Sequence, residues 1–194
     1  MLLYVYWISL HLHPMRSFFI SAILLFLSFA SIAQSKDTCC KVEIYLLNGT
    51  YTFRPDNFSP IGYYMPLRSY LADTPLVHDD EIEGYEVPRD LTQPYYINLK
   101  IATAKRLDSI AKKAPPFDGL PIAIVVDGTP VFGAYIWNVN SQFGCDWIMA
   151  MPFPGRLVLY PGMPHYCFTP DHPDPRANEL LMDRMQRTYR VVNH

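Results

Sequence analysis

The chain has 194 residues, half of them hydrophobic, and a formal net charge of −2 at pH 7. This charge balance, with no basic stripe, excludes the usual electrostatic signature of a nucleic-acid-binding protein. The large apolar fraction excludes an intrinsically disordered chain, although 18 residues are proline.

The N-terminal segment has the layout of an export signal. Arg16 is followed by an apolar run, Phe18–Ala30, and then by the small residues of Ser31–Ala33. The apolar run is shorter than the stretch of about 20 residues that a membrane span needs. We therefore expect residues 1–33 to be an N-terminal extension and cleaved signal, and residues 34–194 to be one exported domain, periplasmic or extracellular, with no membrane span.

The first elements after the signal are predicted from the pattern of apolar residues. Lys41–Leu47 alternates and is rich in branched residues, which is typical of a strand. A loop rich in proline and aromatic residues is expected over Tyr51–Thr74. The segment Leu76–Tyr85 is acidic and short, and we expect one helical turn around Asp80–Glu83.

A strand and an amphipathic helix follow. Tyr95–Lys100 is a strand by the same criteria. In Ile101–Ala114 the period changes, because Ala104, Leu107 and Ala111 are spaced three and four apart. The two prolines that come next end this helix.

The pair Asp127-Gly128 is the strongest turn signal in the chain. It lies between the apolar runs Ile122–Val126 and Val131–Trp137, and a two-residue type I′ turn needs residues that tolerate positive φ at both central positions. A catalytic aspartate would need a carboxylate or histidine partner nearby, and the sequence neighbours supply none. We therefore expect Asp127 and Gly128 to form a structural turn and no catalytic residue.

Two strands, a loop and a helix complete the chain. The strands are predicted at Asp146–Ala150 and Arg156–Tyr160, the loop at Pro161–Pro175, and the helix from a cap at Asp174. The apolar stripe of that helix is expected to comprise Ala177, Leu180, Leu181, Met185 and Tyr189. Because strands and helices do not alternate strictly, the order predicts an α+β fold with a mainly antiparallel sheet and two packed helices.

The cysteines point to disulfides. All four, Cys39, Cys40, Cys145 and Cys167, lie in the part expected to be exported, where pairing of thiols is the default. A bond between the neighbours Cys39 and Cys40 would strain the peptide between them. We expect either pairing of these two with Cys145 and Cys167, or a bond between Cys145 and Cys167 alone, and the sequence does not decide between them.

One cluster of residues has the chemistry of a metal or thiol site. Its members are Cys145, Asp146, His165, Cys167 and His172. Zinc binds thiolate and imidazole ligands, but the spacing of His165 and Cys167 is tighter than the usual structural-zinc pattern, so no metal and no cofactor is expected. The cluster leaves open an alternative function, a small metal- or thiol-dependent hydrolase that uses Cys145, His165, Cys167 and His172.

Two further groups of residues have alternative interpretations. Asp79–Glu81 with Glu83 could hold calcium, but the spacing and the central glycine of a calcium loop are missing, so a solvated helix start is expected. Several tyrosines could line a peptide or sugar groove, although such residues are more often half-buried at the edge of the core. They are Tyr63, Tyr64, Tyr70, Tyr95 and Tyr96.

Short segments between residues 76 and 148 follow one another in the order of a known pattern. They are Leu76–Ile82, Tyr95–Leu99, Ala102–Ala111, Ala123–Gly128, Ala134–Ile136 and Gly144–Ile148. The most specific is the AIVVDG run of Ala123–Gly128. In this order the segments resemble the periplasmic head domain of SecD-type protein-export subunits.

The resemblance implies a ferredoxin-like α+β sheet and a binding role, because the head contacts the exported polypeptide in that family and is not catalytic. Export activity is not implied, since no segment after the signal looks like the membrane spans of SecD. We expect an exported, non-catalytic binding or scaffolding domain that contacts polypeptide or a larger envelope complex. A free edge of the sheet could add an extended peptide as a further strand.

Overall fold

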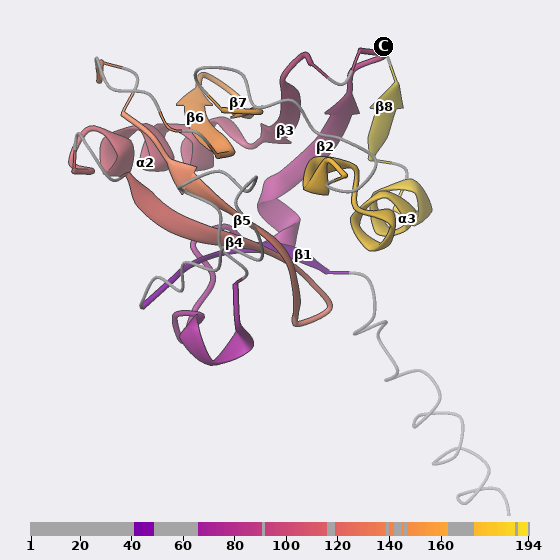
Figure 1. Ribbon diagram of the computed structural model, residues 1–194, viewed down its shortest axis with the longest axis horizontal. Helices are drawn as coiled ribbons and strands as arrows, with labels where there is room; N and C mark the ends of the chain where they lie inside the picture. Colours follow the sequence, from indigo (N-terminus) through magenta and orange to yellow (C-terminus); the bar gives the residue numbers. More distant parts are fainter. Residues whose placement is uncertain are drawn as a thin grey trace, which may run out of the picture. The chain divides into compact units, whose positions relative to one another are not determined.

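One mixed sheet organises the described part of the chain. The computed structural model describes residues 41–48, 66–90, 92–115, 119–138, 140–141, 145, 147–162, 173–188 and 190–193. Within these ranges eight strands lie in the order β1-β4-β5-β6-β7-β3-β2-β8 (Figure 1). Neighbouring strands are antiparallel except in the pairs β5–β6 and β2–β8. The fold class is therefore α+β with a mostly antiparallel sheet, as predicted.

The elements have the following bounds. The strands are β1 (Val42–Leu46), β2 (Ile82–Val87), β3 (Tyr95–Leu99), β4 (Leu120–Val126), β5 (Thr129–Ile136), β6 (Met149–Phe153), β7 (Arg156–Tyr160) and β8 (Val191–Asn193). The α-helices are α2 (Ile101–Ala111) and α3 (Glu179–Arg187), and the 3₁₀ turns are η1 (Arg68–Tyr70), η2 (Asp79–Glu81) and η3 (Pro175–Ala177).

Strand β4 is central to the first half of the sheet, with β1 on one side and β5 on the other. Its residues Ile122–Val126 are all buried, which explains why the sequence shows a continuous apolar run rather than an alternation. The chain then reverses at Asp127 and Gly128, whose φ angles are 49° and 75°. These two residues connect β4 to β5.

Strand β2 occupies part of the segment in which we predicted a helical turn. The turn exists as η2, one residue earlier than expected, and it ends at Glu81. From Ile82 the chain is extended and pairs with β3, with a register shift between Ile82 and Gly84. That irregularity breaks the alternation of buried and exposed residues, so the sequence pattern concealed the strand.

Strand β8 was also missed. It has three residues and pairs in parallel with β2. Such a short strand carries no periodicity of its own, and its place depends on partners that are distant in the sequence.

Strand β6 begins later than predicted. We expected Asp146–Ala150, and the strand runs from Met149 to Phe153. Trp147 lies before the strand, where its indole N–H donates to the carbonyl of Gly133 at 2.8 Å. The strand also continues past Ala150 through Pro152, which has no amide hydrogen to donate to a neighbouring strand.

The C-terminal helix is divided by a second cap. Asp174 accepts a hydrogen bond from the Arg176 amide and caps η3. Asn178 then accepts from the amides of Leu180 and Leu181 and begins α3. The prediction of one helix from Asp174 was therefore wrong, and Leu180, which we placed on the apolar stripe, is exposed.

Helix α2 packs on β6 and β7 and covers part of one face of the sheet. Its buried residues include Ala104, Leu107 and Ala111, the stripe that the spacing predicted. Leu181 and Met185 of α3 join the same core cluster. In Figure 1 α2 lies at the left, near β6, and α3 lies at the right, near β8.

One carboxylate and one helix connect the two outermost strands. Asp79 Oδ1 accepts hydrogen bonds from the amide of Val42 in β1 and from the guanidinium of Arg190 next to β8, both at 2.8 Å. Helix α3 contacts β1, β4 and β8. Because β1 and β8 are at opposite ends of the strand order, these contacts require the sheet to curl.

The outer edge of β1 is covered by the chain itself. Ile44 and Leu47 form isolated bridges with Val77 and Leu71. The amide of Ala72 donates to the Leu46 carbonyl at 2.9 Å. Residues 70–77 thus occupy hydrogen-bonding groups of β1 that an added strand would need.

Candidate functional site

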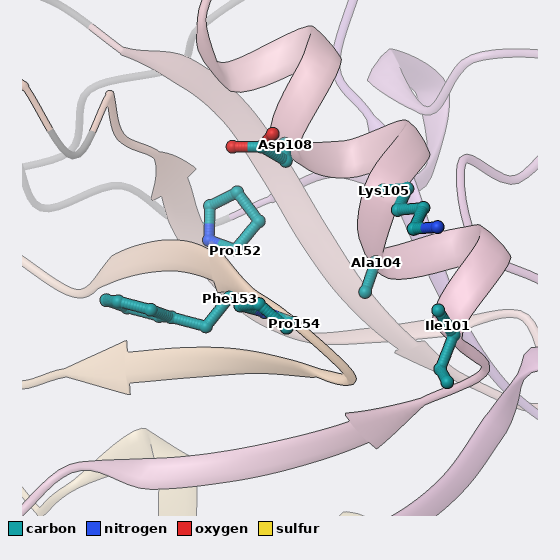
Figure 2. Close-up of a pocket in the computed structure, with 7 residues that line it drawn as sticks. All are labelled: Ile101, Ala104, Lys105, Asp108, Pro152, Phe153 and Pro154. Carbon is teal, nitrogen blue, oxygen red and sulfur yellow. The ribbon is translucent and has the colours of Figure 1, made fainter.

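A groove lies between helix α2 and the hairpin that joins β6 to β7 (Figure 2). Its volume is about 270 Å³. The groove is lined by Ile101, Ala104, Lys105, Asp108, Pro152, Phe153 and Pro154. Figure 2 shows Ile101 and Ala104 pointing from α2 toward the hairpin.

The groove exists because small and rigid residues face each other across it. Ala104 belongs to the buried stripe of α2, yet its methyl group reaches less far than the side chain of Leu107 one turn later. On the hairpin side, Pro152 and Pro154 hold the backbone φ in place and have no long side chain to fill the space. The hollow between them is therefore a consequence of residue size.

The rim of the groove is apolar and exposed. Ile101 is 66% exposed and Phe153 is 39% exposed. Single exposed apolar residues are common on protein surfaces, and here two of them lie beside one apolar hollow.

Two charged residues of α2 also line the groove (Figure 2). Asp108 accepts from Lys112 at 2.7 Å, an i, i+4 pair on the helix surface. Lys105 is exposed and forms no ion pair within the described ranges. The charge of Asp108 is thus balanced within α2, and that of Lys105 is not.

Each acidic residue of η2 forms an ion pair with a cation from elsewhere in the chain. Asp79 pairs with Arg190 at 2.8 Å, Glu81 with Arg106 at 2.9 Å, and Asp80 with Lys100 at 3.4 Å. The prediction of a solvated helix start was therefore wrong for Asp79 and Glu81. Among the residues whose placement is described, no group of three or more His, Cys, Asp and Glu residues could hold a metal ion.

Glu81 has the most perturbed carboxyl group of η2. Burial raises its pKa, but hydrogen bonds from Arg106, from the His78 amide and from the Thr103 hydroxyl together lower the pKa from 4.5 to about 2. The donor–acceptor distances are 2.9, 2.9 and 2.7 Å. Since every partner belongs to the fold, Glu81 fastens η2 to α2 and has no geometry for acid–base work at neutral pH.

A fully buried arginine lies in η3. Arg176 is 0% exposed and forms a bidentate pair with Asp174, with Nη2 to Oδ2 at 2.7 Å. Its Nη1 donates to the Leu159 carbonyl at 2.9 Å, and its guanidinium lies 4.5 Å from the centre of the Tyr95 ring. This cluster anchors η3 to β3 and β7.

Two tyrosines complete that cluster. The Tyr85 hydroxyl donates to the Arg176 carbonyl at 2.7 Å, and burial raises its pKa well above the ordinary value. Burial also raises the pKa of Tyr95 to about 12, assisted by the carboxylate of Asp174. Both hydroxyls are therefore neutral at physiological pH, and Tyr95 is a core residue rather than part of a binding groove.

The other tyrosines that we considered for a groove do not meet in one place. Tyr96 is half-buried and lies under Arg156, with 5.2 Å between the guanidinium carbon and the ring centre. Tyr70 is half-buried at the end of η1. Tyr63 and Tyr64 lie outside the described residues.

Asp127 has an ionisable neighbour that the sequence could not indicate. Its carboxylate pairs with Arg184 of α3 and accepts from the Lys41 amide at 2.8 Å. Arg184 is 57 residues away in sequence. The pair joins the β4–β5 turn to α3, and Asp127 is not among the residues that line the groove.

Only one member of the Cys/His cluster is described. Cys145 is half-buried and packs against the hydrophobic core. His165, Cys167 and His172 lie outside the described residues, as do Cys39, Cys40 and Asp146. Both the disulfide prediction and the hydrolase alternative therefore stay predictions.

The groove was not found from the sequence. Its two walls are separated by about forty residues of chain, and each wall alone looks ordinary: an amphipathic helix and a strand end with prolines. The one local signal was Ile101, an apolar residue at the start of a helix and outside its buried stripe.

Within the described ranges, no helix has both the length and the apolar character needed to cross a membrane. Comparison of the chain with protein-family models, with curated proteins and with solved structures finds no match.

Proposed function

We propose that this chain is an exported, non-catalytic binding or scaffolding protein that contacts polypeptide through the groove between α2 and the β6–β7 hairpin. The observation that carries the proposal is the groove itself: an apolar hollow of about 270 Å³ with exposed Ile101 and Phe153 at its rim. A side chain from a partner can enter the hollow while flanking residues cover the rim.

The ionisable groups of the described residues favour binding over catalysis. Each carboxylate of η2 has a cation from the fold as its partner, and Asp174 is buried with Arg176. Groups that are neutralised by fixed partners stabilise the fold and are not poised to transfer protons to a substrate.

The groove also replaces strand addition as the mode of polypeptide contact. Residues 70–77 cover the edge of β1, and β8 offers an edge of three residues. Affinity in strand addition comes from a row of main-chain hydrogen bonds, and so short an edge provides few of them.

The proposal includes three further points: a relation to SecD head domains, a ferredoxin-like arrangement of part of the sheet, and export of the protein. What supports it is the chain order of β3, α2 and the β4–β5 hairpin, which follows the order of the family pattern. The sheet places β5, β6 and β7 between β4 and β3, so a ferredoxin-like unit would be part of a larger sheet.

The proposal is tested by measuring binding of an unfolded, carboxymethylated polypeptide to the purified protein. We expect saturable binding that weakens about tenfold or more in the double variant Ile101→Ser/Phe153→Ser, since each exposed apolar side chain contributes on the order of 1 kcal/mol when it is covered. Leu180→Ser is the matched control, because Leu180 is 39% exposed like Phe153 but lies on α3. Absence of binding, or equal binding by the double variant, would contradict the proposal.

A further inference from the structure

The charges around the groove are not symmetric. Helix α2 and the turn that follows it carry Lys105, Arg106, Lys112 and Lys113 but a single acidic residue, Asp108. Arg106 is held by Glu81, and Lys112 is held by Asp108. Of the two charges that line the groove, only Lys105 therefore has no ionic partner among the described residues, on a chain whose formal net charge is −2.

The exposed rim of the groove favours a polypeptide over an enclosed small molecule, because the hollow of about 270 Å³ continues into exposed apolar side chains. The exposed Ile101 and Phe153 extend the apolar surface beyond the hollow. An extended segment can bury one side chain in the hollow and cover the rim with its neighbours.

We propose that the groove selects polypeptide segments in which an apolar side chain is next to an acidic residue, with Lys105 pairing to that carboxylate. This inference rests on the proposed function. The long, exposed side chain of Lys105 can turn toward a bound carboxylate at the groove because no ion pair within the described ranges has to be broken first. Asp108 offers no comparable attraction for a basic partner, since Lys112 already balances it.

The test uses three short peptides with one leucine in a serine and glycine background, flanked by glutamate, glutamine or lysine, titrated calorimetrically into the purified protein. We expect the glutamate peptide to bind about two- to fivefold more tightly than the glutamine peptide, the range of an exposed ion pair, and the lysine peptide to bind most weakly. The difference should shrink as salt is raised.

Variants assign the effect to one side chain. Lys105→Gln should remove the preference for glutamate and leave the affinity for the glutamine peptide unchanged. Lys113→Gln, which makes the same charge change at an exposed position off the groove lining, should keep the preference. A preference that survives Lys105→Gln would overturn the inference, because it would come from elsewhere on the surface.

The outcomes also separate this inference from the proposed function. If the three peptides bind equally, the charge selection is wrong and the groove remains a polypeptide site. If none of them binds and the carboxymethylated polypeptide does not bind either, both proposals fail. Binding of anionic lipid vesicles without peptide binding, or dimerisation that buries the groove, would likewise overturn the assignment to an acidic polypeptide.

Discussion

At the scale of single residues, the described ionisable side chains mainly stabilise the fold through ion pairs and hydrogen bonds. Glu81 is the clearest case. Its carboxylate accepts hydrogen bonds from two residues of α2 and from the His78 amide, and these bonds lower its pKa to about 2. The sequence showed the acidic run around it, but Arg106 and Arg190 lie far along the chain, and a one-dimensional pattern does not reveal which cations fold onto which carboxylates. That is why we predicted solvated carboxylates and the structure has ion pairs.

Glu81 makes stability depend on acid. A carboxyl whose pKa is lower in the folded state contributes stability that is fully present above its unfolded pKa near 4.5 and is lost as the pH falls toward about 2. We expect Glu81→Gln to lower the free energy of unfolding by about 2 to 3 kcal/mol at pH 7 and by much less at pH 2.5. Urea unfolding at several pH values measures this.

Glu83→Gln is the control for that measurement, because Glu83 is exposed and two residues away. It should change stability by less than about 0.5 kcal/mol at either pH. Equal effects of the two substitutions at pH 7 would show that the Glu81 hydrogen bonds do not stabilise the fold.

The buried Arg176–Asp174 ion pair is tested by comparing the loss of one partner with the replacement of both. Arg176→Met leaves the carboxylate of Asp174 buried without its cation, and we expect a loss of about 3 to 5 kcal/mol in the free energy of unfolding. The double variant Asp174→Asn/Arg176→Met keeps the oxygen that caps η3 and removes the stranded charge, so it should recover part of the loss. If urea unfolding shows that Arg176→Met lowers the free energy of unfolding by less than about 1 kcal/mol, Arg176 and Asp174 do not form a tightly coupled pair.

At the scale of elements, the sequence predicted those with strong local periodicity. The stripe of α2 and the runs of β4 and β7 carry their signal within a few residues. Strands β2 and β8 were missed because a bulge and a length of three residues leave no period, and α3 begins late because Asn178 forms a second cap. Local patterns thus predict elements well where packing on both sides is regular, and poorly where a cap or a bulge intervenes.

The β4–β5 turn gives an element-scale prediction. Gly128 has φ 75°, and a methyl group there would meet only the Arg68 guanidinium at 3.4 Å, an ordinary contact. Gly128→Ala should therefore lower the free energy of unfolding by about 1 to 2 kcal/mol through backbone strain alone. Thermal and urea unfolding check this value, and a neutral result would mean that the turn changes its geometry.

Asp127→Asn tests the contribution of the Asp127 charge at the same turn without changing the tolerance of this position for positive φ. Asparagine also tolerates positive φ, so the substitution removes only the charge that faces Arg184. We expect a loss of about 0.5 to 1 kcal/mol that becomes smaller at high salt. A loss as large as that of Gly128→Ala, and independent of salt, would contradict the assignment of Asp127 to an ion pair with α3.

At the scale of the whole molecule, the sequence predicted the fold class. It did not predict that the sheet curls so that Asp79 connects its two end strands, which we call the closure of the sheet. Asp79 receives hydrogen bonds from β1 and from Arg190 beside β8, which are the two ends of the strand order. No sequence pattern indicates that residues 42, 79 and 190 meet. The groove has the same origin, since it forms where α2 crosses a hairpin that comes much later in the chain.

The closure of the sheet is tested by removing the Asp79 carboxylate, which accepts the hydrogen bonds from both ends. Asp79→Ala should lower the free energy of unfolding by about 2 to 3 kcal/mol, because it leaves the Val42 amide and the Arg190 guanidinium without that acceptor. It should also speed hydrogen exchange in β8. Asp80→Ala is the matched control: the Asp80 side chain is 79% exposed, so its loss should change stability by less than about 0.5 kcal/mol. Equal effects would argue against closure through Asp79.

The central claim is that partners bind at the groove between α2 and the β6–β7 hairpin. Hydrogen exchange of the purified protein, with and without the carboxymethylated polypeptide, maps the contact directly. We predict added protection at the start of α2 and in the β6–β7 hairpin, and none in β8 or along residues 70–77. Protection at either of those edges, or no protection in α2 and the hairpin while the polypeptide is bound, would contradict the account.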